Sequence, residues 1–223
     1  MSGAKLNKLK SGMDLEKKHQ LKDALNLLEP AAKFDESVDV VIALGIDPKQ
    51  SDQNVRGSCE LPNGTGKDVK VAVFAEGDAA SAALAAGADF VGMDDLGEKI
   101  SKSEISVDIV VASPDSMKVV GKYGRVLGPK GLMPNPKDGT VANDVALATK
   151  SAKSGKIKFK SEKGGLIHCS IGKLSFSKEH LAENIEFLVS TLSKLKPASA
   201  KGKFLKRCFV STTMGPGIEV ELD

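Results

Sequence analysis

Residues 124–141 are the stretch that most restricts how this chain can fold. The sequence there reads Gly-Arg-Val-Leu-Gly-Pro-Lys-Gly-Leu-Met-Pro-Asn-Pro-Lys-Asp-Gly-Thr-Val, with four glycines, three prolines and three cations. Each proline fixes φ and removes a backbone donor, whereas each glycine allows backbone angles closed to other residues. We therefore predict an ordered loop without helix that carries Arg125, Lys130 and Lys137 on a stiff frame. By itself such a loop could hold a phosphate, cap a domain or simply connect two elements.

The composition is that of an ordinary globular protein. The chain has 223 residues, 41% of them hydrophobic and 27% charged, which is enough to bury one large core or two small ones. No apolar run approaches the length of a membrane span, and the N-terminus lacks the apolar stretch of a signal peptide, so we expect a cytoplasmic protein. Cys59, Cys169 and Cys208 lie far apart, which indicates buried small side chains rather than a disulfide or a zinc site.

The positive charge is concentrated near the C-terminus. The net charge is only +3, but residues 157–223 hold 11 lysines and arginines against 7 acidic residues. One run within this segment contains no acid and includes Lys194, Lys196, Lys201, Lys203, Lys206 and Arg207. Such a run can attract phosphates, or it can be the solvated end of a helix whose dipole favours cations.

Both ends of the chain combine helices with strands. Leucines at helical spacing predict a helix over residues 14–29, and Ser177 can cap a second helix that ends before Pro197. Residues 156–160 and 166–171 have apolar residues at alternate positions, so we predict an antiparallel hairpin around the turn at residues 163–165. Three further strands are predicted at residues 38–44, 207–210 and 218–222.

The middle of the chain follows a different pattern. Strands are predicted at residues 69–75 and 107–112, and helices at residues 78–86, 113–122 and 144–154. Strands that alternate with helices indicate a parallel sheet. The sequence therefore predicts an α+β domain formed by residues 1–66 and 157–223, interrupted by an inserted Rossmann-like α/β domain at residues 67–156.

The two crossings between these domains are natural places for a hinge. The candidate hinge residues are Gly64 and Gly66 at the first crossing and Ser154 and Gly155 at the second. A double connection permits bending while it limits twist.

The sequence offers no catalytic constellation. The first strand of the middle domain is followed by Glu-Gly-Asp rather than by a dinucleotide-binding fingerprint, and no P-loop is complete. His168 and Cys169 are neighbours on a predicted strand, so their side chains point to opposite faces and cannot act as a base and nucleophile pair. We expect neither an enzyme nor a metal or cofactor. The alternative that remains is an α/β enzyme that binds a nucleotide or a phosphometabolite, and nothing argues directly for a protein-interaction scaffold.

Several separated motifs resemble one known family. Alongside residues 124–141, these motifs are Lys33-Phe-Asp-Glu-Ser-Val38, residues 44–57, residues 61–67, residues 164–173 and Ser211-Thr-Thr-Met-Gly-Pro-Gly217. Taken in chain order, these motifs resemble those of the family of ribosomal protein one of the large subunit. That family builds the mobile stalk beside the tRNA exit site. Relatives tend to carry Thr where this chain has Ser37, a change that keeps the hydroxyl.

The C-terminal turn is the centre of the expected RNA-binding surface. Aromatic residues make up only 4% of the chain, so recognition of RNA shape is expected rather than stacking on several bases. The hydroxyls of Thr212 and Thr213 can meet ribose oxygens, and Met214 can lie against a sugar or a base. Gly215 removes a side chain that would hold RNA away. The other interpretation is an ordinary turn between two strands.

The resemblance adds two further places to this surface. It implies that Lys33 holds phosphate, that Phe34 supports the face by packing and that Ser37 offers its hydroxyl, although plain core packing is an equal interpretation for Phe34. Lys163 and His168 would add a phosphate contact and a hydrogen bond to a base or ribose, unless His168 is only structural. Weaker contacts would come from the three cations of the 124–141 loop.

The resemblance also implies a function. The chain would be a structural protein that binds stalk rRNA of the large subunit and helps release deacylated tRNA from the exit site. It would also bind the leader of its own operon mRNA and repress translation. We expect a monomer when the protein is free, located in the cytoplasm and on the ribosome.

Overall fold

The chain divides into two compact units. The computed structural model describes residues 17–48, 50–200 and 202–221. One unit contains the described residues of 1–66 and 157–223, and the other contains residues 67–156. The first unit is therefore built from both ends of the chain, and the second is a continuous segment between them.

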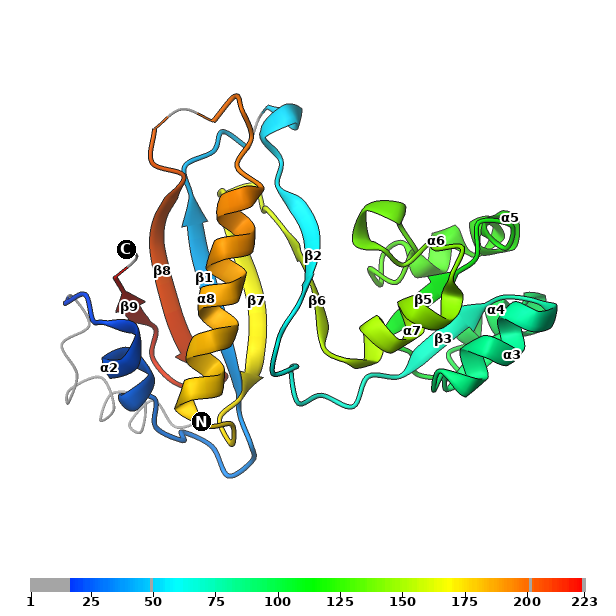
Figure 1. Ribbon diagram of the computed structural model, residues 1–223, viewed down its shortest axis with the longest axis horizontal. Helices are drawn as coiled ribbons and strands as arrows, with labels where there is room; N and C mark the ends of the chain where they lie inside the picture. Colours follow the sequence, from blue (N-terminus) through cyan, green and yellow to red (C-terminus); the bar gives the residue numbers. More distant parts are fainter. Residues whose placement is uncertain (1–16, 49, 201, 222–223) are drawn as a thin grey trace. The chain divides into compact units, whose positions relative to one another are not determined.

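A four-stranded antiparallel sheet forms the centre of the first unit (Figure 1). The strand order is β7-β1-β8-β9, with β1 at Ser37–Leu44, β7 at Leu166–Lys173, β8 at Leu205–Thr212 and β9 at Ile218–Val220. Alternate residues of β1 are buried, from Val38 to Leu44. The sheet therefore has one buried face, as period-two alternation requires.

Two helices pack beside this sheet. Figure 1 shows α8, Lys178–Lys194, lying along the strands, and α2, Leu21–Asn26, contacts both α8 and β9. The hydroxyl of Ser177 accepts a hydrogen bond from the His180 amide at 3.2 Å, which confirms the predicted helix cap. Leu188 and Leu192 of α8 are fully buried in the core shared with the sheet.

The predicted hairpin between residues 156–160 and 166–171 is wrong. β6, Lys156–Lys160, pairs with β2, Arg56–Glu60, in a separate two-stranded sheet, while β7 pairs with β1. The chain does make a tight turn, in which the Gly165 amide donates to the Glu162 carbonyl at 2.9 Å. Alternation in a sequence indicates which face a strand buries but not which strand is its partner.

The second unit is built on a parallel sheet. Its strand order is β4-β3-β5, with β3 at Val71–Phe74, β4 at Phe90–Gly92 and β5 at Ile109–Ala112. Every residue of β3 and β5 is buried, which is typical of parallel strands covered on both faces. Residues of α3 (Gly77–Ala85) and α7 (Val145–Lys153) share one core with the sheet, and residues of α4 (Asp94–Ser101), α5 (Met117–Lys122) and α6 (Gly124–Leu127) share another.

The loop at residues 124–141 contains helical turns that the sequence analysis excluded. Its first four residues form α6, because they precede the prolines and Leu127 is fully buried. Pro136–Asp138 forms a short 3-10 helix, capped by the side chain of Asn135. The Asn135 amide also donates to the Thr140 hydroxyl at 2.8 Å. The remainder is an ordered loop, as the proline and glycine pattern predicts.

Other boundaries differ from the prediction. The helix predicted at residues 14–29 is α2 alone, and residues 14–16 lie outside the described part of the chain. The helix predicted from residue 113 begins only at Met117, after a turn in which the Ser113 and Ser116 hydroxyls lie 2.7 Å apart. β4 and α4 were not predicted. They occupy residues 90–101, where the apolar runs are short and show no clear period.

A pair of neighbouring residues on α8 tests how the first unit is stabilised. Leu188→Ala should lower its free energy of unfolding by about 2–5 kcal/mol, because a buried leucine leaves a cavity when truncated. Phe187→Ala is the matched control, since Phe187 is 44% exposed and its loss should change stability by less than about 1 kcal/mol. Urea unfolding followed by circular dichroism measures both, and equal effects would contradict the assigned helix face.

Candidate nucleic-acid interface

The buried carboxylate of Glu36 organises the predicted RNA-binding surface. Its side chain has no exposed area. One carboxylate oxygen accepts a hydrogen bond from the Ala31 amide at 2.6 Å, and also one from the Ala32 amide. The other accepts from the Met214 amide at 2.9 Å. One side chain thus joins the loop before β1 to the turn after β8, which are 178 residues apart in sequence.

These hydrogen bonds keep Glu36 ionised inside the protein. Burial by itself would raise the pKa of this carboxyl, because a low-dielectric site disfavours the charged form. The amides of Met214, Ala32 and Ala31 outweigh burial and hold the pKa below its ordinary value of 4.5. A buried, fully bonded carboxylate therefore fixes two loops at once.

Thr212 does not face solvent, which corrects the predicted ribose contact. The residue is only 3% exposed, since it is the last inward-facing position of β8. A Cβ placed on Gly215 would lie 2.4 Å from the Thr212 hydroxyl oxygen. Gly215 is therefore needed inside the protein, to make room for Thr212, and the clearance for RNA that the sequence analysis expects there stays a prediction.

Thr213 extends the pairing between β8 and β1. Its amide donates to the Ser37 carbonyl at 3.0 Å, and its hydroxyl accepts from the Ser37 amide at 3.0 Å. Thr213 is nevertheless exposed, and Ser37 is partly exposed. The structure thus brings these two predicted residues together from opposite ends of the chain.

Three side chains on this end of the sheet are available to a partner. Phe34 is 57% exposed, so the alternative of core packing is wrong. Lys33 is exposed, and Met214, whose amide is bound by the Glu36 carboxylate, is partly exposed. We call Lys33, Phe34, Ser37, Thr213 and Met214 the β1–β8 surface.

Lys163 and His168 lie elsewhere on the sheet. His168 of β7 pairs with Val41 in the middle of β1, and its Nε2 is 3.8 Å from a Glu162 carboxylate oxygen. Lys163 is in the turn before β7, where the Leu44 amide donates to the Gly165 carbonyl. Because β1 has eight residues, Lys163 lies roughly 25 Å from the Ser37 end of the sheet. The structure therefore separates this lysine from the β1–β8 surface.

Sequence reasoning missed two polar interactions of the first unit, one beside the β1–β8 surface and one farther along the sheet. Asp35 accepts hydrogen bonds from the Ser175 amide at 3.1 Å and hydroxyl at 2.9 Å, and Lys173 lies 3.8 Å away. Arg207 of the acid-free run makes two hydrogen bonds to Glu219, at 3.0 and 2.6 Å. Neither acid stands out in the sequence, because only the folded chain brings its partner near.

The weaker predicted contacts belong to the second unit. Arg125, Lys130 and Lys137 are all exposed on the ordered loop. The Lys130 ammonium lies 3.5 Å from the Ser103 hydroxyl. The loop therefore presents cations to solvent, as its sequence predicts.

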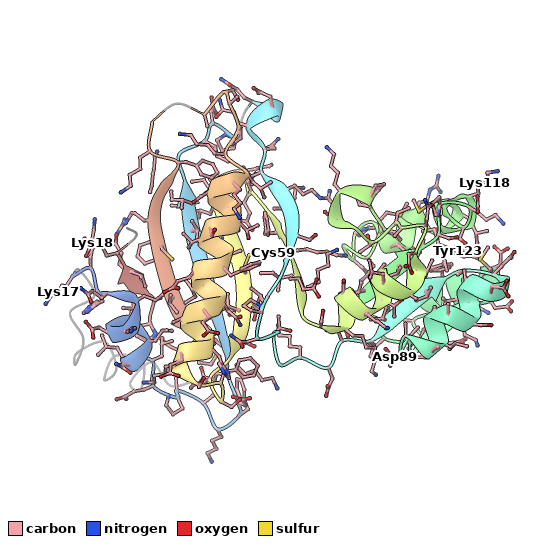
Figure 2. All side chains as sticks on the ribbon, in the orientation of Figure 1. Lys17, Lys18, Cys59, Asp89, Lys118 and Tyr123 are labelled. Atoms are coloured by element: carbon pink, nitrogen blue, oxygen red, sulfur yellow. The ribbon has the colours of Figure 1, made fainter. Side chains whose placement is uncertain are left out.

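The cysteines are inert. All three are buried, and burial raises the pKa of Cys59 to about 11 and of Cys169 and Cys208 to about 12. Figure 2 labels Cys59 on β2. Within the described residues no cluster of three histidine, cysteine or acidic side chains could hold a metal ion. No described helix is both long and apolar enough to cross a membrane.

Comparison with known proteins decides the family. Residues 20–216, most of the chain, match the family described as Ribosomal protein L1p/L10e. The chain belongs to this family. The resemblance stated from the sequence motifs is thereby confirmed, and a mixed α/β fold agrees with it.

Relatives match over nearly the whole chain. Large ribosomal subunit protein uL1 of Alkalilimnicola ehrlichii is 56% identical over 96% of this chain and 94% of that protein. The uL1 protein of Mannheimia succiniciproducens is 54% identical over 98% of both chains. That of Haemophilus influenzae is 53% identical over 97% of this chain and 96% of that protein. Membership of a ribosomal protein family confirms that the chain is not an enzyme, and the phosphometabolite enzyme is set aside.

Substitution of Glu36 tests how the surface is held. Glu36→Gln should lower the free energy of unfolding at pH 7 by about 1–3 kcal/mol, because the side-chain amide nitrogen cannot accept from the backbone amides. The folded-state pKa is depressed, so this contribution is complete above pH 4.5 and is lost as the pH falls through the folded-state pKa. Denaturant unfolding from pH 7 to pH 3 should show the two proteins converging in acid.

Exposed Glu29 provides the control for this experiment. Glu29→Gln should change the unfolding free energy at pH 7 by less than about 0.5 kcal/mol. A Glu36→Gln protein as stable as the wild type at pH 7 would contradict the assigned role.

Proposed function

We propose that the chain is a structural protein of the large ribosomal subunit that binds rRNA of the mobile stalk through the β1–β8 surface. The observation that carries this proposal is the buried Glu36 carboxylate, which holds Phe34 and Met214 exposed on two loops from opposite ends of the sequence. An exposed aromatic ring and a partly exposed methionine on one rigid support are suited to a ligand surface. The family and the names of the relatives support a ribosomal partner.

The chemistry of the surface favours folded RNA. Lys33 can meet a phosphate, and the hydroxyl of Ser37 and the backbone of the turn can meet 2′-hydroxyl groups. Phe34 and Met214 can lie against a sugar or a single base. With one aromatic ring on the surface, recognition depends on RNA shape rather than on a series of stacked bases.

The resemblance supports a wider role on the ribosome. The protein, located in the cytoplasm and bound to the ribosome, would help release deacylated tRNA from the exit site. It would use the same surface to bind a similar fold in the leader of its own operon mRNA and repress translation. Competition between rRNA and leader RNA for one site tests this second role, because independent binding of both would exclude a shared surface.

A double hinge between the two units is part of the proposal. The Gly64 carbonyl accepts a hydrogen bond from Asn184 of α8 at 3.1 Å, so the first crossing is anchored up to that point. At the second crossing, Lys153 is paired with Asp89 at 3.1 Å, immediately before Ser154 and Gly155. Figure 2 labels Asp89 in the second unit.

Glycines at both crossings adopt backbone angles that a side chain would hinder. Gly64, Gly66 and Gly155 all have positive φ, at 65°, 66° and 99°, which other residues rarely adopt. A Cβ on Gly66 would approach the Phe176 ring to 2.7 Å, so this glycine is also held by the first unit. We therefore place the bending on the second-unit side of Gly66 and at Ser154 and Gly155.

Two substitutions test the RNA-binding surface. Phe34→Ala and Met214→Ala should each weaken binding to a folded stalk-rRNA fragment by about 1–3 kcal/mol without a change in Tm, because both side chains reach solvent. Filter binding in a salt series, with a scrambled RNA of equal length, gives the selective part of the affinity.

Phe187→Ala is the control, because it removes a partly exposed aromatic ring from α8. It should bind RNA as the wild type does. The proposal fails if all three variants bind alike, or if the wild type binds both RNAs equally with a steep dependence on salt.

Removal of the second unit tests whether the first unit alone binds the rRNA. A protein with residues 66 and 157 joined by a short linker should keep most of the affinity for the rRNA fragment, since the β1–β8 surface lies wholly in the first unit. The same binding assay measures it, together with a circular dichroism spectrum to establish that the fragment is folded. Complete loss of binding by a folded fragment would contradict the proposal.

A further inference from the structure

Asp35 places a negative charge beside the β1–β8 surface. It lies in the loop before β1, between exposed Phe34 and buried Glu36, and its side chain is 39% exposed. A carboxylate at this place repels phosphates and weakens the attraction that Lys33 provides. An acid here therefore has a role other than contact with the RNA backbone.

Both oxygens of the Asp35 carboxylate bind the segment that follows β7. Oδ1 accepts a hydrogen bond from the Ser175 amide at 3.1 Å, and Oδ2 accepts one from the Ser175 hydroxyl at 2.9 Å. The Lys173 ammonium lies 3.8 Å from Oδ2, but an ion pair this exposed adds little by itself. The two hydrogen bonds thus join residues that are 140 apart in sequence.

The segment between β7 and α8 is a fixed support for these bonds. It ends at Ser177, whose hydroxyl caps α8, and the Leu174 amide donates to the Glu36 carbonyl at 2.8 Å. Figure 1 shows the start of β1, the end of β7 and the start of α8 at the same end of the first unit. Asp35 is therefore bound to a segment that other interactions already hold in place.

The loop before β1 is held on both sides of Phe34. Before this residue, two backbone amides bind the Glu36 carboxylate, and after it Asp35 binds Ser175. Phe34 is 57% exposed, so packing alone does not fix its ring. The direction of the ring depends on the backbone on either side, and Asp35 fixes one of those sides.

We propose that Asp35 is a positioning residue for the selection of RNA. It holds the loop in the shape in which Phe34 meets folded stalk rRNA, and its charge disfavours RNA that gains nothing from that contact. The inference rests on the function proposed above, because Asp35 acts through Phe34 and makes no RNA contact of its own. Position and charge have opposite effects on affinity when the acid is removed, which separates the two.

Removal of the carboxylate tests this role. Asp35→Ala should weaken binding to the folded stalk-rRNA fragment about tenfold, because Phe34 is no longer held. Its affinity for a scrambled RNA of equal length should stay equal or rise up to about twofold, since a negative charge is lost. Asp115→Ala, which removes an exposed carboxylate of the second unit, is the charge-matched control and should change neither affinity by more than about twofold.

Ser175→Ala tests the same connection without a change in charge. It removes the hydroxyl that donates to Asp35 and keeps the amide, so binding to the rRNA fragment should weaken about threefold while binding to scrambled RNA stays the same. In a Phe34→Ala background, Asp35→Ala should cause no further loss, because its effect passes through the ring. Circular dichroism establishes that each variant is folded, and Ser175→Ala decides the question if Asp35→Ala is not.

The pattern of affinities separates this inference from the proposed function. If Asp35→Ala binds both RNAs more tightly, or keeps the preference of the wild type, the acid positions nothing and the inference is overturned. An equal loss for both RNAs, or a further loss in the Phe34→Ala background, overturns it as well, because Asp35 would then act without the ring. If the wild type fails to select the rRNA fragment over scrambled RNA, the proposed function itself fails.

Discussion

The charge buried at Glu36 is the constraint on which the first unit depends. An ionised carboxylate without solvent contact must be hydrogen-bonded, and its donors come from residues 31 and 32 on one side and Met214 on the other. The two ends of the chain therefore have to meet for either loop to take its shape. The Glu36 carbonyl accepts from the Leu174 amide at 2.8 Å, so the same residue also fixes the end of β7. A structural requirement for a buried charge thus produces a rigid surface.

That surface has an inner polar layer and an outer layer. The inner layer contains the buried side chains of Glu36 and Thr212. Gly215 also belongs to it, because the Thr212 hydroxyl occupies the space that a Cβ on Gly215 would need. Phe34 and Met214 belong to the outer layer and are accessible to a partner. Because adjacent residues of the motif serve different layers, a run of residues that reads as one binding motif divides into supporting and contacting positions once it is folded.

The sequence predicts elements better than their partners. The α8 helix follows from its leucine spacing and the Ser177 cap, and the buried strands β1, β3 and β5 follow from their apolar runs. Nothing local indicates that β6 pairs with β2, since strand partners are chosen by contacts distant in sequence. The motif residues of the candidate site are identifiable from resemblance, but Glu36 and Thr212 are polar residues that a sequence alone places at the surface. Their burial depends on a loop and a turn 178 residues apart.

The two units have separate cores, and this bears on the proposed hinge. The second unit buries both faces of its own parallel sheet with its own helices, so its stability does not depend on the first unit. The hydrogen bonds of the β1–β8 surface all lie within the first unit, on residues far in sequence from both crossings. Bending at the crossings therefore breaks none of the bonds that shape the surface. Under the proposed function, the first unit can therefore stay fixed on its RNA while the second unit moves, as binding to a mobile stalk would require.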